Sequence, residues 1–554
     1  MKISLALLLL LFVSRLACAQ VSPEKEIDKI VAEMIRPGSA GATVAVAKGD
    51  KILFSKGYGM SNPEYDIANT PKTIFHVASV SKQFTAFAIA LLADQGKISL
   101  DDDIRKYFPE FHDFGEKITI KHLVHHTSGL RDQWNLLALA GWRLDDVITK
   151  NQILRLISHQ EALNFKPGSE FSYCNTGYTL IGEIVSRVSG KTFGAWCSEN
   201  IFKPLQMNNT IFYEDHEKIV KGRSYSFHDE NGELKKSVLS YANAGATSLF
   251  TTAEDLTKWS NNFYTMKVGN AKVMKQMEER ARLNSGDTLS YAFGQDISEY
   301  RGVRVIAHSG GDAGYRTFLM RFPEQQYTIV VLSNMGSFNP MSLANKIADI
   351  YLKDHLKENP KKQEEKLTAG AHNVSEQLMK LYEGQYRLNN DMIVTVKLDN
   401  GKLTAQATGQ PQLPLKASSD TSFVVEGFDI GLTFHKPGNT SASHFTLHQG
   451  GRNTIAPRMK PFDPKSLDLK AFVGKYYSPE LQTSYTLSLK GDTLIANHIR
   501  HEPVKIVATG PDTFSGDAWF MSKLDFTRNE KSEIVGFKVS SGRVRNVRFE
   551  KKQD

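Results

Sequence analysis

The sequence predicts an α+β protein: an antiparallel sheet with helical layers, followed by two small antiparallel β-barrels. Two runs of alternating apolar and polar residues flank a Lys48-Gly49-Asp50 turn, and three more strand patterns follow residue 300. Helical patterns lie between these groups, and beyond a charged stretch the chain repeats one strand-rich pattern. Strands at both ends with helices between them favour one mixed domain before the repeats.

The individual elements follow from their patterns. Residues 41–60, "GATVAVAKGDKILFSKGYGM", alternate as a hairpin does. Helical spacing of apolar residues predicts helices at 80–95, 120–126, 178–188, 253–264 and near 341–352. Strands are predicted at 303–308, 317–322 and 328–333.

The C-terminal part repeats itself. "YEGQY" at 382–386 is similar to "FVGKY" at 472–476, and "VTVKLDNGKLTAQ" at 394–406 is similar to "YTLSLKGDTLIAN" at 485–497. Alternation between Gly, Asn and Asp turns predicts a barrel from each copy. We therefore expect a first domain at 20–355, a linker at 356–374 and β-barrel repeats at 375–461 and 462–554.

The opening "MKISLALLLLLFVSRLACAQ" is typical of a signal peptide, because Lys2 precedes an apolar run and Ala17 and Ala19 are small. Residues 1–19 are predicted to be removed, so the mature chain is expected to be exported to the periplasm or secreted. Lipoprotein anchoring through Cys18 is the alternative, but Arg15 stands where such signals usually have a small aliphatic residue.

The composition is that of an ordinary globular protein, with 41% hydrophobic and 23% charged residues. A formal net charge of +8 would suit an acidic partner, but the basic residues are dispersed, so no nucleic-acid partner is predicted. No later segment is long and apolar enough for a membrane span. After cleavage only Cys174 and Cys197 remain, which argues against a disulfide framework.

A serine and a lysine stand three residues apart in "HVASVSKQFTAFAIALLADQG" (76–96). A serine hydroxyl becomes nucleophilic when a group accepts its proton, and a lysine can do so if burial lowers its pKa. At the start of a helix, Ser79 and Lys82 would lie one turn apart on one face. An isolated Ser-x-x-Lys is more often an N-cap serine and a surface lysine. Ser22 and Lys25 have the same spacing but lie in the frayed new N-terminus, with no pocket around them.

Two further segments favour the catalytic interpretation. "SYCNTGYTLIGEIV" puts Tyr173 and Asn175 on one side of an extended segment before a helix. "HSGGDAGYRTFLMRFPE" puts His308 and Gly310 two apart at a strand end, where the lack of a side chain at Gly310 would let a substrate backbone lie close.

With these segments the sequence resembles the serine β-lactamase and penicillin-binding-protein superfamily, closest to its class C β-lactamase, D,D-peptidase and D-aminopeptidase branch. "HVASVSKQFTA", "ITIKHLVHHTSGL", "FSYCNTGYTLIGEIV", "SLFTTAEDLTKW" and "HSGGDAGY" carry the resemblance, which covers about residues 21–352. A similar tail of two lipocalin-like barrels occurs in D-aminopeptidase relatives, where a barrel can reach toward the active site and restrict substrate size.

The resemblance implies a role for each matching residue. Ser79 would be acylated, Lys82 would take or relay its proton, and Tyr173 would act as general base or as proton shuttle to the leaving group. Asn175 would orient the substrate amide, and His308 would polarise or hold the substrate. The backbone N–H groups of Ser79 and Gly311 would form the oxyanion hole.

The third motif departs from β-lactamases, which usually have lysine where this chain has His308. Histidine carries only a partial positive charge at neutral pH, so the fit to a β-lactam carboxylate is weaker. The resemblance therefore favours peptidase or esterase chemistry, since some D,D-peptidases and D-aminopeptidase-like relatives also have histidine there.

Other candidate residues have simpler interpretations. His122, His125 and His126 lack the glutamate of an H-E-x-x-H zinc motif and are interpreted as core or turn residues, so no metal is predicted. Cys174 should point away from its motif neighbours and pack in the core. The tail aromatics are interpreted as barrel core: Tyr382, Tyr386, Phe472, Tyr476, Trp519 and Phe520.

The preferred hypothesis is an exported serine hydrolase without cofactor that cleaves an amide or ester, as a D-aminopeptidase or D,D-peptidase does. Its partner would be a small peptide or ester substrate. A broad carboxylesterase or weak class C-like β-lactamase is the second hypothesis. A non-catalytic binding or scaffold protein on the same fold is the third.

Overall fold

The computed structural model describes residues 22–357, 372–388, 392–407, 412–425, 430–436, 438–449, 452–460 and 462–553. The predicted signal peptide, Cys18 included, and most of the predicted linker lie outside these residues. Within them, no helix is long and apolar enough to cross a membrane.

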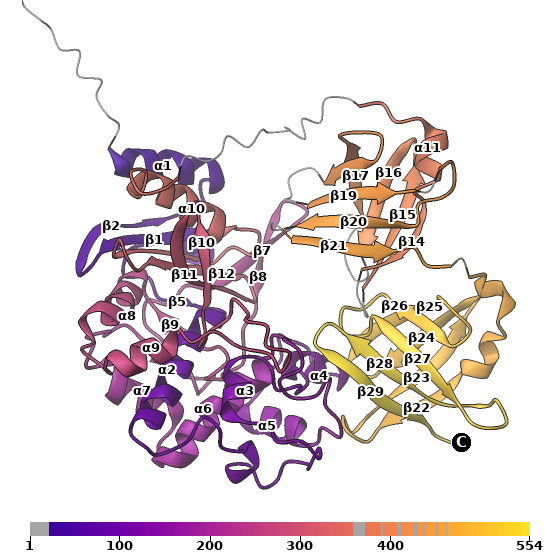
Figure 1. Cartoon of the computed structure of the whole chain (residues 1–554), viewed down its shortest axis with the longest axis horizontal. Coiled ribbons are helices and arrows are strands. Elements are labelled where there is room, and N and C mark those ends of the chain that lie inside the picture. Colours follow the sequence, from indigo (N-terminus) through magenta and orange to yellow (C-terminus); the bar gives the residue numbers. More distant parts are fainter. Residues whose placement is uncertain are drawn as a thin grey trace, which may run out of the picture.

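The first domain is built on a six-stranded antiparallel sheet in the order β10-β11-β12-β13-β1-β2 (Figure 1). Its strands are β10 (Asp296–Tyr300), β11 (Val303–Asp312), β12 (Tyr315–Phe322), β13 (Tyr327–Ser333), β1 (Ala42–Lys48) and β2 (Lys51–Tyr58). The predicted hairpin and the three predicted strands are confirmed. Strand β1 pairs with β13 from Ala42–Ser333 to Lys48–Tyr327, so the two ends of the domain close into one sheet.

Both faces of this sheet are covered. Val44 and Val46 of β1 belong to a core shared with α1 (Pro23–Met34) and α10 (Pro340–Tyr351), whereas Ala45 belongs to the core on the other face. This alternation is the two-residue period of a strand. Ser22 caps α1 with its side chain, so the segment predicted to be a frayed N-terminus instead starts a helix.

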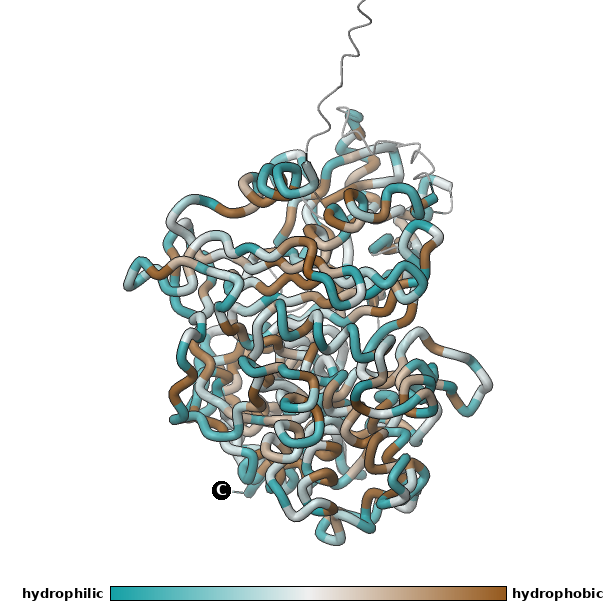
Figure 2. Tube along the Cα trace, turned by 90° about the vertical axis from the view of Figure 1, so that its left-hand side faces the viewer, coloured by the Kyte–Doolittle hydropathy of each residue, from teal (hydrophilic) through white to brown (hydrophobic). Residues whose placement is uncertain are grey.

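The second face carries the helical part of the domain. Helix α2 (Ser81–Asp94) is central, and every residue from Ser81 to Leu92 is buried. Around it lie α3 (Ile120–Val124), α4 (Gln133–Leu139), α5 (Lys150–Ser158), α6 (Asn175–Ser189), α7 (Phe193–Cys197), α8 (Ala253–Thr265) and α9 (Ala271–Met277). Apolar stretches run through the interior and hydrophilic loops lie outside (Figure 2). The predicted helices are thus confirmed within a few residues at their ends.

Two eight-stranded antiparallel sheets follow. β14–β21 form a nearly closed barrel and β22–β29 form a closed one. The first contains β14 (Gly384–Arg387), β15 (Ile393–Asp399), β16 (Lys402–Ala407), β17 (Leu413–Ala417), β18 (Ser422–Val425), β19 (Ile430–His435), β20 (His444–Gln449) and β21 (Arg452–Pro457). The second contains β22 (Gly474–Ser478), β23 (Thr483–Lys490), β24 (Thr493–His498), β25 (His501–Ala508), β26 (Thr513–Gly516), β27 (Lys523–Arg528), β28 (Ile534–Ser541) and β29 (Val544–Lys551).

The repeat seen in the sequence is a repeat of structure. Tyr386 and Tyr476 are fully buried at equivalent positions, and each hydroxyl donates to the carbonyl four residues earlier, at 2.7 and 2.9 Å. These tyrosines and Phe472 are barrel core, as predicted. Because a buried tyrosine hydroxyl needs a hydrogen-bond partner, this bond fixes the orientation of the first strand in both barrels.

The second barrel packs against α4 of the first domain, where β28 and β29 lie beside that helix (Figure 1). Helix α4 ends with carbonyl groups that have no partner inside the helix. The barrel supplies donors: Tyr485 Oη donates to Leu139 O at 3.1 Å, and His501 Nε2 lies 2.6 Å from Ala138 O. The barrel therefore completes a helix of the first domain.

Candidate active site

Ser79 lies in a short 3₁₀ turn, η2 (Ala78–Val80), directly before α2. Ala78, its predecessor, has a φ of 47°, in the left-handed region that side chains rarely adopt. Such strain persists only where the surrounding structure imposes it, and it is common at active sites. The turn presents Ser79 at the start of α2, whose residues from Ser81 to Leu92 are all buried.

The side chain of Lys82 is fully buried beneath Ser79. Its Nζ lies 3.1 Å from Ser79 Oγ, 2.9 Å from Asn175 Oδ1 and 2.7 Å from Ala246 O. A carbonyl oxygen can only accept, so two N–H groups of Lys82 are used by Asn175 and Ala246. In the neutral amine, the lone pair is then left for the hydroxyl proton of Ser79.

Burial lowers the pKa of Lys82 to about 7, with a further lowering by the positive charge of Arg543. A substantial fraction of Lys82 is therefore neutral near pH 7, which a proton acceptor requires. Its nitrogen also lies 4.9 Å from the centre of the Tyr173 ring.

Tyr173 is held by rings on several sides and by little else. Its ring centre is 4.2 Å from that of His126 and 6.1 Å from that of His308. Its buried hydroxyl completes no hydrogen bond with the described residues. Burial raises the pKa of Tyr173, and the nearby Ser79 hydroxyl lowers it by a smaller amount. A phenol with a raised pKa keeps its proton, which favours the shuttle role over that of an anionic base.

Asn175 is the first residue of α6 and connects Lys82 to a carboxylate that sequence reasoning missed. While its Oδ1 accepts from Lys82, its Nδ2 and its backbone N–H donate to Asp132 Oδ2 at 2.9 and 2.6 Å. Asp132 is buried, and its other oxygen accepts from Trp134 N. Asn175 thus organises the site as well as lining it.

His308 lies on β11, and its ring is neutral. Burial lowers its pKa to about 4, with Lys82 contributing. Its Nδ1 lies 2.6 Å from Ser309 O and must donate to it, so Nε2 of the neutral ring accepts from Tyr291 Oη at 3.3 Å. His308 therefore brings no positive charge to the site.

The two glycines of the third motif have different surroundings. A Cβ at Gly310 would collide with Val77 O and Thr317 Oγ1, whereas at Gly311 the nearest neighbour, Arg316, is 3.8 Å away. We expected Gly310 to admit substrate, but this glycine instead lets the Ser79 segment pack against β11. Gly311 is exposed and lines the pocket.

A pocket of about 910 Å³ opens above these groups. Ser79, Tyr173, Asn175, His308 and Gly311 all line it, so the structure brings these predicted residues together, with Lys82 buried below. The second barrel supplies another wall through Trp519, Gly542 and Arg543. Trp519 is 45% exposed, which corrects its assignment to the barrel core.

Arg543 stands in the turn between β28 and β29. Its guanidinium lies 4.8 Å from the centre of the Tyr173 ring and 3.8 Å from Asp132 Oδ2. No local pattern in the sequence indicated this residue, because it lies far from every motif and reaches the pocket only through docking of the barrel.

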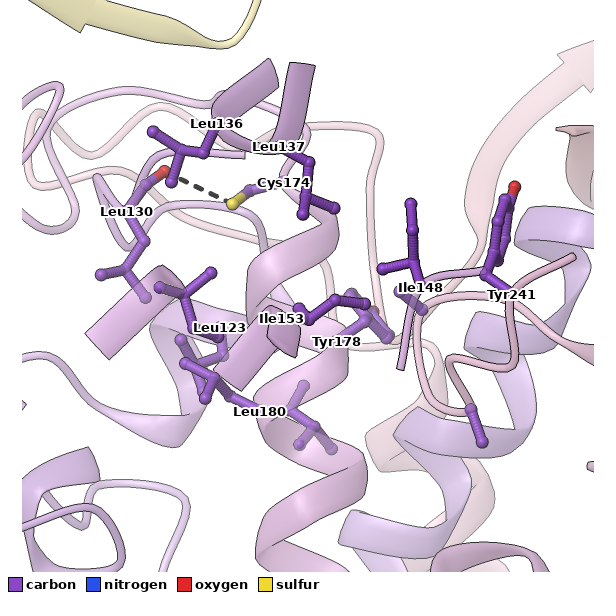
Figure 3. Close-up of a cluster of buried hydrophobic side chains, with 14 of the residues drawn as sticks. Leu123, Leu130, Leu136, Leu137, Ile148, Ile153, Cys174, Tyr178, Leu180 and Tyr241 are labelled. Carbon is purple, nitrogen blue, oxygen red and sulfur yellow. Dashed lines mark hydrogen bonds between the residues drawn. The ribbon is translucent and has the colours of Figure 1, made fainter. Parts of the chain in front are cut away.

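The residues around the motifs have structural roles. His126 Nδ1 accepts from the backbone N–H of Cys174 at 3.0 Å, which fixes the extended segment between Tyr173 and Asn175. Cys174 points away from the pocket into an apolar cluster, where Sγ lies 3.3 Å from Leu130 O (Figure 3). Burial raises the pKa of its thiol to about 12, so it is a packing residue, as predicted. His122 caps the start of α3 through Nδ1.

Comparison with known proteins identifies the family. Residues 27–351 match the Beta-lactamase family model, so the chain belongs to the Beta-lactamase family. Penicillin-binding protein 4* of Bacillus subtilis (strain 168) is 27% identical over 435 residues, covering 76% of this chain and 95% of that protein. The chain is therefore a hydrolase of the serine β-lactamase and penicillin-binding-protein type.

Solved structures share the fold. A penicillin-binding protein homologue from Pyrococcus abyssi, described as octameric, aligns with a TM-score of 0.55 and 24% identity over 78% of this chain and 99% of its own. A D-amino acid amidase from Ochrobactrum anthropi SV3 aligns with a TM-score of 0.51 and 21% identity over 60% of this chain and 97% of its own.

Proposed function

We propose that this protein cleaves an amide or ester bond of a short peptide through an acyl-enzyme on Ser79. One observation carries the proposal. Lys82 is buried, its N–H groups donate to two carbonyl oxygens, and the lone pair of its neutral amine is left for Ser79 Oγ, 3.1 Å away. A lysine with a surface role would not be buried under three oxygens. The arrangement matches what a nucleophile and its base require.

The reaction would run in two halves. Neutral Lys82 takes the Ser79 proton while Oγ attacks the substrate carbonyl carbon, and the N–H groups of Ser79 and Gly311 stabilise the oxyanion. Tyr173, protonated because its pKa is raised, donates to the leaving group and is reprotonated through Lys82. Water then attacks the acyl-enzyme and releases Ser79, with the same groups moving the protons in reverse.

The pocket supports a small substrate. Its volume of about 910 Å³ lies within the range for small-molecule sites, and the second barrel closes one side of it. Similarity to a D-amino acid amidase favours peptides or amides with D-residues. Burial lowers the pKa of His308, so the third motif has no cation to bind the carboxylate of a β-lactam. Efficient β-lactamase activity is therefore not favoured.

Intact-mass measurement after reaction with a fluorophosphonate, and separately with a penicillin, tests the proposal. We expect one adduct on the wild type that is absent from Ser79→Ala. Turnover of D-aminoacyl anilides, p-nitrophenyl esters and a chromogenic cephalosporin then separates peptidase, esterase and β-lactamase activity. An adduct that persists in Ser79→Ala, or none on the wild type, would contradict the proposal and favour a binding or scaffold role.

We also propose that the chain is exported after cleavage behind Ala19, on the pattern of Lys2, the apolar run and the small residues that follow. N-terminal sequencing of the mature protein tests this. An N-terminus at Gln20 is expected, whereas a lipid-modified Cys18 would establish the lipoprotein alternative.

A further inference from the structure

The pocket lacks a cation in the third motif but receives one from the second barrel. His308 is neutral and uses both ring nitrogens within the protein. Arg543 is a guanidinium, which stays charged at any physiological pH. Its side chain is 45% exposed and lines the pocket together with Ser79.

The backbone that carries Arg543 is fixed to the first domain. Its carbonyl oxygen accepts from Asp132 N at 3.3 Å and from Asn164 Nδ2 at 2.9 Å, and Arg545 N donates to Asn164 Oδ1 at 2.7 Å. Asn135 Nδ2 donates to Ser541 O on the other side of the turn. The arginine is thus presented by an anchored turn, and its ring contact with Tyr173 limits the guanidinium further.

The guanidinium retains its hydrogen-bonding capacity. It donates to none of the described residues, and its distance of 3.8 Å to Asp132 Oδ2 is too long for a hydrogen bond. Asp132 is already satisfied by three N–H donors from Asn175 and Trp134. The N–H fork of Arg543 is therefore available to a ligand.

The other charged side chains of the pocket are more fully engaged. Arg316 donates from Nη1 to Ala313 O and Tyr315 O, which turns it back onto its own strand. Asp312 accepts from Tyr241 Oη and Thr247 Oγ1, and Asp296 accepts from Ser290 Oγ. The negative charges of Asp312 and Asp296 would repel a ligand carboxylate that lay beside them. The favoured place for such a carboxylate in the pocket is therefore at Arg543.

We propose that Arg543, which the second barrel brings to the pocket of the first domain, forms a subsite for a carboxylate of the substrate. The inference rests on the proposed function and narrows its substrate class to acidic short peptides or acyl compounds, because a guanidinium binds a carboxylate through two parallel hydrogen bonds. The barrel would therefore select by charge.

Two matched pairs of chromogenic esters test this subsite. One pair carries the charge in the acyl part: the 4-nitrophenyl monoester of adipic acid and its terminal carboxamide. The other pair carries it in the leaving group: 3-carboxy-4-nitrophenyl acetate and its 3-carboxamide. The ratio of kcat/KM within a pair, corrected for spontaneous hydrolysis, measures charge selection separately from the rate of the chemistry.

We expect the wild type to prefer the carboxylate by about tenfold in at least one pair, as a charge-assisted hydrogen bond provides. Arg543→Gln should bring this ratio close to one, and Arg543→Lys should retain part of it. Arg548→Gln is the matched control, since Arg548 lies on the same hairpin and pairs with Glu161 at 3.2 Å. Its ratio should stay that of the wild type.

Equal rates within both pairs, the absence of turnover included, would overturn the inference, as would a preference that Arg543→Gln leaves intact. Failure of the proposed function has a different signature, because hydrolysis of all four esters would then persist in Ser79→Ala. Charge selection lost in Arg543→Gln together with activity lost in Ser79→Ala supports both.

Discussion

The guanidinium of Arg131 and the carboxylate of Glu480 form an ion pair at 2.5 Å with 1% and 3% of their side chains exposed. The two residues are 349 positions apart. Arg131 also donates from Nε and Nη2 to the carbonyl of Arg545 at 3.1 and 2.9 Å. Asp132, which accepts hydrogen bonds from Asn175, directly follows Arg131. The residue that holds the second barrel and the residue that holds Asn175 are therefore neighbours in the chain.

Arg131→Met should destabilise the docked barrel. Removal of one partner leaves Glu480 buried without its counter-charge, which costs about 3–5 kcal/mol in comparable pairs. We expect a lower Tm for Arg131→Met by scanning calorimetry and recovery of much of the loss in Arg131→Met/Glu480→Met. If single and double variants melt alike, the pair contributes no such coupling.

Activity should rise with pH as Lys82 loses its proton. Because its pKa is lowered to about 7, the neutral base is scarce at pH 6 and dominant at pH 8. A profile of kcat/KM should therefore climb through about pH 7. Arg543→Gln removes a charge that lowers this pKa and should move the rise to higher pH. A flat profile between pH 6 and 8 would exclude Lys82 as the titrating base.

Gly310→Ala should disturb the nucleophile, whereas Gly311→Ala should be tolerated by the fold. A methyl group at position 310 meets Val77 O and Thr317, and Val77 lies two residues before Ser79. At position 311 there is room. We expect a clear drop in Tm and in fluorophosphonate labelling for Gly310→Ala alone; equal Tm values for the two variants would contradict this assignment.

Stability should fall as the pH is lowered below 6.5. Burial lowers the pKa of His76, His125 and His308 to about 4 in the folded protein, so the unfolded chain binds more protons between pH 6.5 and 4. Their contribution is complete above pH 6.5 and is lost as the pH falls toward 4, by up to about 1.4 kcal/mol per pH unit for each histidine. Tm measured from pH 7.5 to 4.5 should decrease, and His125→Gln should make the decrease shallower.

Local pattern was enough to predict the framework of the first domain and the repeat of the tail. Helix α2 and strands β11 to β13 have apolar residues at the periods of their elements, and these periods depend only on neighbours in the chain. The family resemblance carried by the motifs likewise implied that Ser79, Lys82, Tyr173, Asn175 and His308 would gather at one place.

The residues that hold the site residues in place escaped prediction for a physical reason. Asp132 and His126 act through hydrogen bonds to backbone N–H groups of residues more than forty positions away, and such contacts leave no periodic trace. Gly310 was assigned to substrate because its close neighbour, the η2 turn, becomes adjacent only when the domain folds.

The sequence by itself determined the elements and the repeat, since each depends on spacing along one segment, and its motifs implied the chemical groups around Ser79 through their resemblance to a known family. Tertiary structure alone decided the electrostatics of the pocket. Burial lowers the pKa of both Lys82 and His308, and docking of the second barrel brings Arg543 to the ring of Tyr173. Desolvation and through-space charge depend on what surrounds a group in three dimensions, which no local pattern records.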